Sequence, residues 1–223
     1  MSKLIIGASR GIGLELVRQL TQRGDDVIAA VRSSNAELDA TGADIHTGVD
    51  VTRHDSLHEL ADKLGNQPLE WLLVVAGVMS KQRLGQLDQD AVDGIRQQFE
   101  TNALGPLMAA EALSPWLAPG GKLGILTSRM GSLADNTSGN SYGYRMSKAA
   151  VNMAGVSLAH DLQEREIAVA LLHPGWVRTD MTRHDGLIDP EESAAGIIQR
   201  MDALTLNQTG RFWHAPKGEP LPW

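Results

Sequence analysis

The 223-residue chain contains no cysteine, which excludes disulfide bonds, thiolate catalysis and cysteine-ligated metals. The fold must therefore be held by packing alone, as suits a reducing compartment, and we expect a cytoplasmic protein. No apolar run approaches the roughly 20 residues that cross a bilayer. No signal peptide is visible, because the first apolar segment already begins near residue 3. Repeats, low-complexity tracts and interdomain linkers are also missing, so we expect one domain over residues 1–223.

Basic charge is in short supply, because 20 lysines and arginines stand against 27 aspartates and glutamates, for a formal net charge of −7. A general binder of nucleic acid or of an anionic membrane needs a basic surface, so neither is expected as a partner. Hydrophobic residues make up 42% of the chain, a share that is normal for a globular domain with a sizeable core.

Apolar runs typical of strands alternate with helical periodicity along the whole chain, which predicts an α/β protein with helices on both faces of a mostly parallel sheet. We expect a three-layer, doubly wound Rossmann fold with about seven strands. Strands are predicted at residues 3–6, 26–31, 43–49, 71–76, 122–127, 167–172 and 211–214, and the main helices at 14–20, 55–64, 90–116, 141–164 and 190–204. Asp55 is the expected N-cap of its helix, and a break is expected near Gly105-Pro106.

A glycine-rich turn, Gly7-Ala8-Ser9-Arg10-Gly11-Ile12-Gly13, joins the first predicted strand to the first predicted helix. Glycines let the backbone approach a dinucleotide pyrophosphate, and the helix N-terminus offers free N–H groups and the positive end of its dipole. The strand–turn–helix context is the one that a dinucleotide fingerprint requires, although the spacing is Gly-x-x-x-Gly-x-Gly instead of Gly-x-Gly-x-x-Gly. The alternative is a tight turn that binds no ligand.

Tyr144 and Lys148 lie four residues apart near the start of a long helical segment, so they share one helix face. A fixed cation favours the phenolate and lowers the pKa of a tyrosine, which suits the pair to proton transfer nearer neutral pH. Tyr142 lacks such a partner, because Met146 stands four residues on and carries no charge. The alternative is a solvated pair on the helix surface.

Further motifs follow the glycine turn in order: Asp50-Val51, Ala76-Gly77, Asn102, Ser128, Tyr144 with Lys148, and Pro174-Gly175. Over nearly the whole chain, this set resembles a short-chain dehydrogenase/reductase of the single-domain kind. Segments 128–132 and 142–145 are most similar to the sniffer and C-factor branch of carbonyl reductase-like proteins. The sequence departs from the family at 74–75, where two valines stand in place of the asparagines that many members carry.

The resemblance implies a role for each catalytic candidate. Tyr144 would be the general acid in carbonyl reduction and the general base in alcohol oxidation, while Lys148 would lower its pKa and hydrogen-bond the nicotinamide ribose. Ser128 would hold the substrate oxygen, with Ser132 as the alternative because extra residues lie within 133–139. Asn102 would distort its helix and order a water for a proton relay to Lys148, or would simply mark a helix boundary.

The resemblance also implies an NADP(H) site. We predict a preference for NADPH over NADH, because Arg32 follows the second strand where folds that choose NAD place a carboxylate. Arg32 and Arg10 would hold the 2′-phosphate, unless both are simply exposed loop charges. By resemblance, Asp50 would contact the adenine, and Val177 and Thr179 would hold the nicotinamide carboxamide. The other expected cofactor contacts are Gly7, Ser9, Arg10, Gly11, Ile12, Gly13, Arg32, Val51, Ala76, Gly77, Tyr144, Lys148, Pro174 and Gly175.

Met130 and Trp176 are candidate walls of the substrate pocket, although core packing is the commoner role of such residues, and the short segment 180–190 is the expected lid. His54 and His58 share a helix face, but no third ligand is evident, so no metal site is predicted.

The sequence therefore predicts an NADP-dependent oxidoreductase that interconverts a carbonyl and an alcohol on a small-molecule substrate. The alternative is a signalling or sensor protein of C-factor type, which binds the dinucleotide with little turnover. By resemblance, the helices predicted at 90–116 and 141–164 would form the interface of a homodimer or homotetramer.

Overall fold

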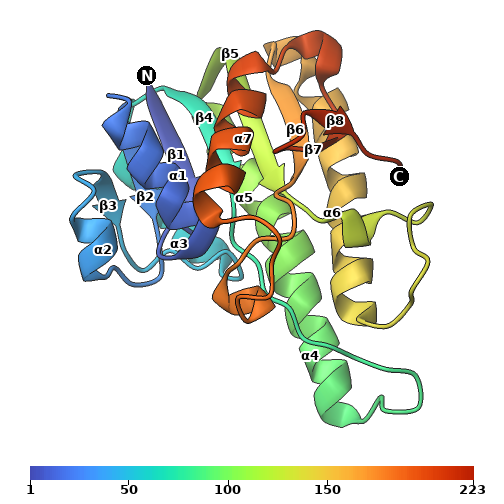
Figure 1. The fold of residues 1–223 in the computed structure, drawn as a ribbon. Helices are drawn as coiled ribbons and strands as arrows, with labels where there is room; N and C mark the ends of the chain where they lie inside the picture. Colours follow the sequence, from blue (N-terminus) through green and yellow to red (C-terminus); the bar gives the residue numbers. More distant parts are fainter.

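The computed structural model describes all 223 residues, which build an eight-stranded sheet in the order β3-β2-β1-β4-β5-β6-β7-β8 (Figure 1). Neighbouring strands from β3 to β7 are parallel, and β8 is antiparallel to β7. The predicted doubly wound α/β fold is confirmed, and β8 is a strand that the sequence pattern did not indicate. The strands are β1 (Ser2–Ile6), β2 (Val27–Ala30), β3 (Asp44–His46), β4 (Leu69–Val74), β5 (Leu117–Leu126), β6 (Ala168–His173), β7 (Arg211–His214) and β8 (Glu219–Pro220).

Helices cover both faces of the sheet, with α1 and α7 on one face and α3, α5 and α6 on the other (Figure 1). Side chains alternate along each strand, so Leu4 and Ile6 of β1 enter one core while Ile5 enters the other. None of the helices is both long enough and apolar enough to span a bilayer. The α-helices are α1 (Gly11–Gln22), α2 (Ala36–Asp39), α3 (His54–Leu64), α4 (Gln89–Phe99), α5 (Gly105–Leu113), α6 (Tyr142–Asp161) and α7 (Pro190–Ala203).

Several element boundaries differ from those predicted. Helix α3 begins at His54 with Arg53 as its N-cap residue, so the expectation that Asp55 caps this helix is wrong. Asp55 lies instead within the first turn, where its carboxylate meets the positive end of the helix dipole. Helix α6 stops at Asp161, and a separate 3₁₀ turn over Gln163–Arg165 accounts for the rest of the predicted helix.

The predicted break in the helix over 90–116 is a π-helical segment, Glu100–Leu104, between α4 and α5. It ends immediately before Gly105-Pro106. Proline has no backbone N–H to donate, and its ring crowds the carbonyl four residues earlier, which here belongs to Asn102. The distortion therefore falls on the residue that the sequence singled out within this helix.

The predicted site residues gather at the point where the strand order of the sheet reverses. Strands β1 and β4 are neighbours, and the chain leads from β1 outward to β2 and β3 on one side and from β4 to β5 and β6 on the other. In such sheets the ligand crevice lies outside the carboxyl ends of the strands at this switch point. Gly7, Ala76, Ser128 and Pro174 all follow the carboxyl ends of β1, β4, β5 and β6.

Candidate active site

The glycine turn packs tightly against the end of β4. Gly7 has a φ of 93°, and a Cβ placed on it would lie 2.6 Å from the backbone nitrogen of Ala76. A Cβ on Gly13 would lie 2.2 Å from the Gly7 carbonyl oxygen, so neither position has room for a side chain. Arg10 precedes α1 without a side-chain cap, which leaves N–H groups of the first helical turn available to an anion.

The loops after β1 and β2 are tied together beside this turn. The Asn35 side-chain nitrogen donates to the Ser9 carbonyl oxygen at 2.7 Å, and Asn35 also caps α2. Arg32 is exposed, and no carboxylate follows β2 at this position. The two loops thus form one surface that carries Ser9, Arg10 and Arg32.

Arg10 does not stand free in the structure, because its guanidinium pairs with Asp180 at 3.3 Å. Both side chains are largely exposed, and an ion pair of this kind is weak and easily exchanged for another anion. The first turn of α1 and the start of the lid also meet here, since a Cβ on Gly11 would lie 3.2 Å from Cγ2 of Thr179.

Asp50 lies after β3, where the sequence places the adenine contact. Its carboxylate accepts hydrogen bonds from the backbone nitrogen and the hydroxyl of Thr52 at 2.9 and 2.8 Å. Although partial burial raises the pKa of Asp50, these two hydrogen bonds hold it below its ordinary value, so this carboxylate stays ionised. The neighbouring Val51 is buried.

Asn102 is fully buried in the π segment and bonds to the chain just after β4. Its Oδ1 accepts from the Val78 backbone nitrogen, and its Nδ2 donates to the Val78 carbonyl oxygen, both at 2.8 Å. Nδ2 also donates to the Ser147 hydroxyl at 3.1 Å. A Cβ on Gly77 would lie 3.3 Å from Asn102 Oδ1 and 3.7 Å from Lys148 Nζ, so this glycine keeps the space between the two groups open.

Tyr144 and Lys148 are both buried on α6 and are not the solvated surface pair that was the alternative. Lys148 Nζ lies 5.8 Å from the centre of the Tyr144 ring and donates to the Leu126 carbonyl oxygen at 2.9 Å. This bond fastens the ammonium to the last residue of β5, one residue before Thr127. Sequence reasoning missed this anchor, because a backbone carbonyl leaves no signature in the residue pattern.

The pKa of Tyr144 runs against the expected direction. Burial raises it above its ordinary value, and the hydrogen bond with the Ser128 side chain offsets only part of that rise. Burial also lowers the pKa of Lys148 to about 8, so the lysine loses part of its charge near neutral pH. The expectation of a lowered Tyr144 pKa is therefore wrong for this structure, because burial disfavours the phenolate and the Ser128 side chain offsets only part of that effect.

Ser128 rather than Ser132 faces the tyrosine. The Ser128 side chain is near enough to Tyr144 to lower its pKa, and its hydroxyl accepts from the Met130 backbone nitrogen at 3.1 Å. The Ser132 hydroxyl instead donates to the Trp223 carbonyl oxygen at 3.1 Å, far along the chain. The 3₁₀ turn Arg129–Gly131 packs directly on α6, because a Cβ on Gly131 would lie 2.7 Å from the Lys148 carbonyl carbon.

The segment after β6, which contains the predicted lid, turns back on itself. Val177 and Ile188 form an isolated parallel bridge, and a 3₁₀ turn over Asp180–Thr182 lies between them. The Thr182 hydroxyl donates to the Val177 carbonyl oxygen at 2.6 Å, which holds this turn closed on itself. Trp176 is 48% exposed, which is unusual for a tryptophan that serves only the core.

The histidine pair on α3 does have a third neighbour. The Nε2 atoms of His54 and His58 lie 3.1 Å apart, and Glu111 of α5 brings a carboxylate oxygen to 3.6 Å from His58 Nε2. Glu111 is more than fifty residues away in sequence, which is why the pattern of α3 alone did not indicate it. This cluster lies on α3 and α5, and none of the predicted site residues belongs to it.

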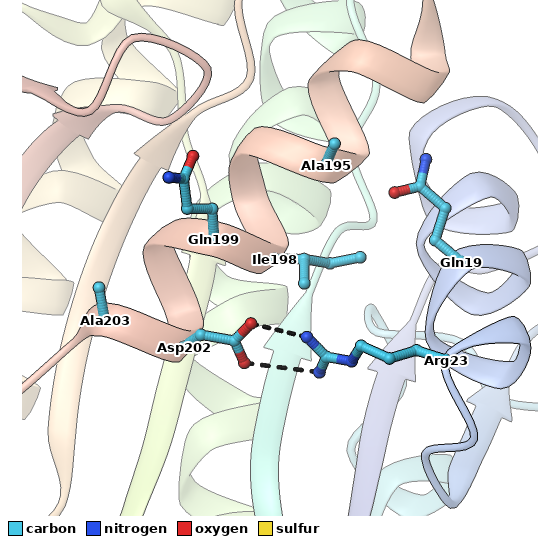
Figure 2. A pocket seen from close by; sticks show the side chains of 7 residues that line it. All are labelled: Gln19, Arg23, Ala195, Ile198, Gln199, Asp202 and Ala203. Atoms are coloured by element: carbon cyan, nitrogen blue, oxygen red, sulfur yellow. Dashed lines mark hydrogen bonds and ion pairs between the residues drawn. The ribbon is translucent and has the colours of Figure 1, made fainter.

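A surface depression of about 530 Å³ between α1 and α7 contains none of the predicted site residues (Figure 2). Arg23 and Asp202 form a two-pronged ion pair across it, at 2.6 and 3.4 Å. Both residues lie near the C-terminal ends of their helices, on the side of the amino ends of the strands and opposite the crevice. This depression therefore reflects how α1 and α7 are joined and has no part in the candidate active site.

The comparison with protein families agrees with this arrangement. The model of the short chain dehydrogenase family matches residues 3–187. The chain therefore belongs to the short-chain dehydrogenase/reductase family, as the ordered motifs predicted.

Among individual relatives, the chain is 47% identical to the 1-hydroxy-2-glutathionyl-2-methyl-3-butene dehydrogenase of Rhodococcus sp. (strain AD45), over 99% of this chain and 98% of that protein. It is 44% identical to the C-signal of Myxococcus xanthus, over 61% of this chain and 82% of that protein.

Solved structures of the same shape include a short-chain dehydrogenase/reductase from Burkholderia multivorans with bound NADP, at a TM-score of 0.89 and 30% identity over 100% of this chain and 99% of that one. The carbonyl reductase Sniffer of D. melanogaster has the same TM-score at 28% identity and the same coverage. These matches confirm the predicted resemblance to the sniffer and C-factor branch.

We predict that Lys148→Met flattens the rise of stability above about pH 8. The folded-state pKa of Lys148 is about 8 and its ordinary value is 10.5, so the unfolded chain binds more protons between these values and stability rises with pH. From about pH 8 to about pH 10, this contribution to the free energy of unfolding is about 2 kcal/mol. Urea unfolding at both pH values measures it.

The matched control is Lys63→Met, which removes an exposed lysine and should keep the pH dependence of the parent protein. If Lys148→Met and the parent gained equal stability over this pH range, the Lys148 pKa would not be lowered in the folded protein.

Proposed function

We propose that this protein is an NADP-dependent oxidoreductase that interconverts a carbonyl and an alcohol on a small-molecule substrate. The observation that carries the proposal is the buried grouping of Ser128, Tyr144 and Lys148 beside the glycine turn, at the carboxyl ends of β1, β4 and β5. A buried phenol, hydroxyl and ammonium in one crevice are expensive to keep in a fold unless a reaction uses them.

The chain's own residues fit the proposed cofactor. The close approach of Gly7 and Gly13 leaves bare backbone at the N-terminus of α1, where a pyrophosphate is favoured. Arg32 stands where a carboxylate would select NADH, and Arg10 lies on the adjoining loop. Asp50 stays ionised at the position proposed for the adenine, with Val51 beside it. Pro174, Gly175, Val177 and Thr179 lead into the lid that would hold the nicotinamide end, whose C4 supplies or accepts the hydride.

Proton transfer falls to Tyr144. Its raised pKa keeps the phenol protonated at neutral pH, which suits a general acid in carbonyl reduction. The Ser128 hydroxyl, which lies beside Tyr144, would hold the substrate oxygen at the same place. In alcohol oxidation the phenolate must form, and there the Lys148 ammonium, held in place by Leu126, would stabilise its negative charge.

Asn102 is the candidate for the far end of a proton path. It lies in the π segment, and Gly77 keeps open the space between its amide oxygen and Lys148 Nζ. A water in that space would have polar partners on both sides, which is the condition for an ordered buried water. We propose that Asn102 and Lys148 return a proton to Tyr144 through such a water.

The substrate itself is suggested by one relative. The dehydrogenase of Rhodococcus sp. is named for an alcohol that carries a glutathionyl group, and it is 47% identical over 99% of this chain. We propose an alcohol or carbonyl compound of the same type, with Met130 and Trp176 as walls of its pocket. Met130 follows Ser128 by two residues, and Trp176 lies before the lid with nearly half its surface exposed.

A second function is favoured by the similarity to the C-signal of Myxococcus xanthus, at 44% identity over 138 residues. In this alternative the protein binds the dinucleotide as a signal or sensor with little turnover. The intact grouping of Ser128, Tyr144 and Lys148 argues for the enzyme, because a binding protein has no need of a buried proton donor.

Self-association is proposed through the helices beside the active site. Leu104, Leu107, Met146 and Met153 are apolar yet 39 to 69% exposed, and they lie on the segments from Glu100 to Leu113 and on α6. Not every apolar residue of these two helices is available for an interface, since Leu113 is fully buried in the chain's own core. We propose a homodimer or homotetramer in the cytoplasm, a reducing compartment that suits a chain without cysteine.

Tyr144→Phe should lower carbonyl reduction by about 10²- to 10⁴-fold, because only the acidic hydroxyl is removed. NADPH consumption with a panel of aldehydes and ketones measures this loss, and NADPH titration should show nearly unchanged binding. Tyr142→Phe is the matched control, since this tyrosine lies on the same helix without a lysine four residues on. Near-normal turnover by Tyr144→Phe on a confirmed substrate would rule out Tyr144 as the proton donor.

Replacing Arg10 and Arg32 together by alanine should weaken NADPH binding by about 2–3 kcal/mol, the scale of hydrogen bonds to charged groups. NADH binding should change much less, because NADH lacks the 2′-phosphate. Titration at fixed ionic strength compares the two cofactors, with Arg211→Ala as a control that removes an exposed arginine from β7. Equal affinity of the parent protein for NADPH and NADH would refute this assignment.

Light scattering should give at least twice the 24.0 kDa of one chain, and Met153→Glu should shift the population toward monomer. The reason is that a charge would be added to a helix face with exposed apolar side chains, where the proposed interface would remove it from water. A parent protein that is monomeric at working concentration would contradict the proposed assembly.

A further inference from the structure

A second pocket, of about 260 Å³, adjoins the turn after β5 and the start of α6, the two segments that carry Ser128 and Tyr144. It is lined by Lys81, Gln82, Arg83, Met130, Ser138, Gly139, Asn140, Ser141 and Arg145. Met130 donates its backbone N–H to the Ser128 hydroxyl, and Arg145 directly follows Tyr144 on α6. A substrate held at Ser128 and Tyr144 can therefore extend into this pocket.

The pocket is cationic although the chain as a whole is acidic. Three of its nine lining residues are Lys81, Arg83 and Arg145, and none is an aspartate or glutamate. None of these three side chains has a carboxylate within 4.0 Å, whereas Arg10, Arg23 and Arg178 are each paired with an aspartate. Three unpaired positive charges around one hollow attract an anion.

Arg145 is oriented by neutral groups only. Its Nε donates to the carbonyl oxygens of Gly139 and Asn140 at 3.1 and 3.2 Å, and one terminal nitrogen donates to the Ser138 hydroxyl at 2.9 Å. These bonds fix the guanidinium plane without neutralising its charge. Asp135 is close enough for Arg145 to help lower its pKa, but its carboxylate is already paired with Arg129.

The loop that carries Lys81 and Arg83 is fastened to the start of α6. Gln82 between them is 3% exposed, and its side-chain oxygen accepts from the Gly143 backbone nitrogen at 3.0 Å. Its carbonyl oxygen also accepts from the Ser141 backbone nitrogen at 2.9 Å. Lys81 and Arg83 therefore flank Gln82, which is anchored to the segment just before Tyr144, and this sets where the two cations lie relative to Tyr144.

We propose that this pocket binds a carboxylate of the substrate, so that the protein acts on carbonyl or alcohol compounds with a carboxylate on an arm that reaches beyond the reacting carbon. This inference rests on the proposed oxidoreductase function and adds the substrate class to it. The guanidinium of Arg145 suits a carboxylate by its planar fork, and Lys81 and Arg83 add charge at the rim.

The test uses pairs of substrates that differ in one charge. A series of ω-oxo carboxylic acids of increasing chain length is compared with their methyl esters, with NADPH consumption as the readout. For the chain length that spans the two sites, kcat/KM should favour the acid by about tenfold or more, mostly through KM, since one tenfold step corresponds to about 1.4 kcal/mol. This preference should shrink as salt is raised, because the pocket's cations are accessible to solvent.

The variant Lys81→Gln/Arg83→Gln should reduce the ratio of acid to ester kcat/KM by about tenfold, while Lys63→Gln, which removes an exposed lysine on α3, should leave the ratio unchanged. Neither Lys81 nor Arg83 makes a side-chain hydrogen bond or ion pair within the protein, so the double variant should fold. Equal kcat/KM for acids and esters in the parent, or an unchanged ratio in the double variant, overturns the proposal while the oxidoreductase function stands. If no member of the series or of a general aldehyde and ketone panel is reduced, the proposed function itself fails and this inference fails with it.

Discussion

The buried ammonium of Lys148 is the group around which the rest of the active site is arranged. A charged amine out of water needs partners, and the Leu126 carbonyl at the end of β5 supplies one at 2.9 Å. That bond draws α6 onto the end of the sheet, and the missing side chain of Gly131 allows the turn after β5 to lie against the same stretch of helix. Ser128 and Tyr144 reach each other because both of their elements are held to Lys148.

The surrounding polar groups form a layer that is nearly closed on itself. Asn102 bonds Val78 in both directions and reaches Ser147 on α6, and the Thr127 hydroxyl donates to Asn152 Oδ1 at 2.6 Å. These bonds join three pairs of segments, so the π segment Glu100–Leu104, α6 and the loops after β4 and β5 support one another. Such a layer makes the position of the catalytic side chains a property of the whole fold and not of one helix.

The fold was predictable because its signals are local or repeat along the chain. Continuous apolar runs mark strands buried on both faces, and the glycine turn before α1 has no room for any other residue at Gly7 or Gly13. The candidate catalytic residues were predictable from their types and order. The burial of these residues was not predictable. The upward shift of the Tyr144 pKa depends on that burial, which a spacing of four residues on a helix does not reveal.

What escaped the sequence depends on contacts between distant segments. Glu111 joins His54 and His58 only because α5 packs beside α3, and the cationic pocket needs Lys81, Arg83 and Arg145 from two separate segments. The Leu126 carbonyl and the Val78 backbone are invisible for another reason, since every residue type offers the same backbone groups. The strand β8 has only two residues, too few for any periodicity to show.

The short strand β8 limits the addition of further strands to the sheet. β8 covers the open side of β7, and its Pro220 has no N–H to offer a further strand. At the opposite border β3 is only three residues long. An extended segment from another molecule would find few free backbone groups to pair with at either outer strand, which protects the protein from edge-to-edge aggregation. Contacts between copies would then have to form through the helices.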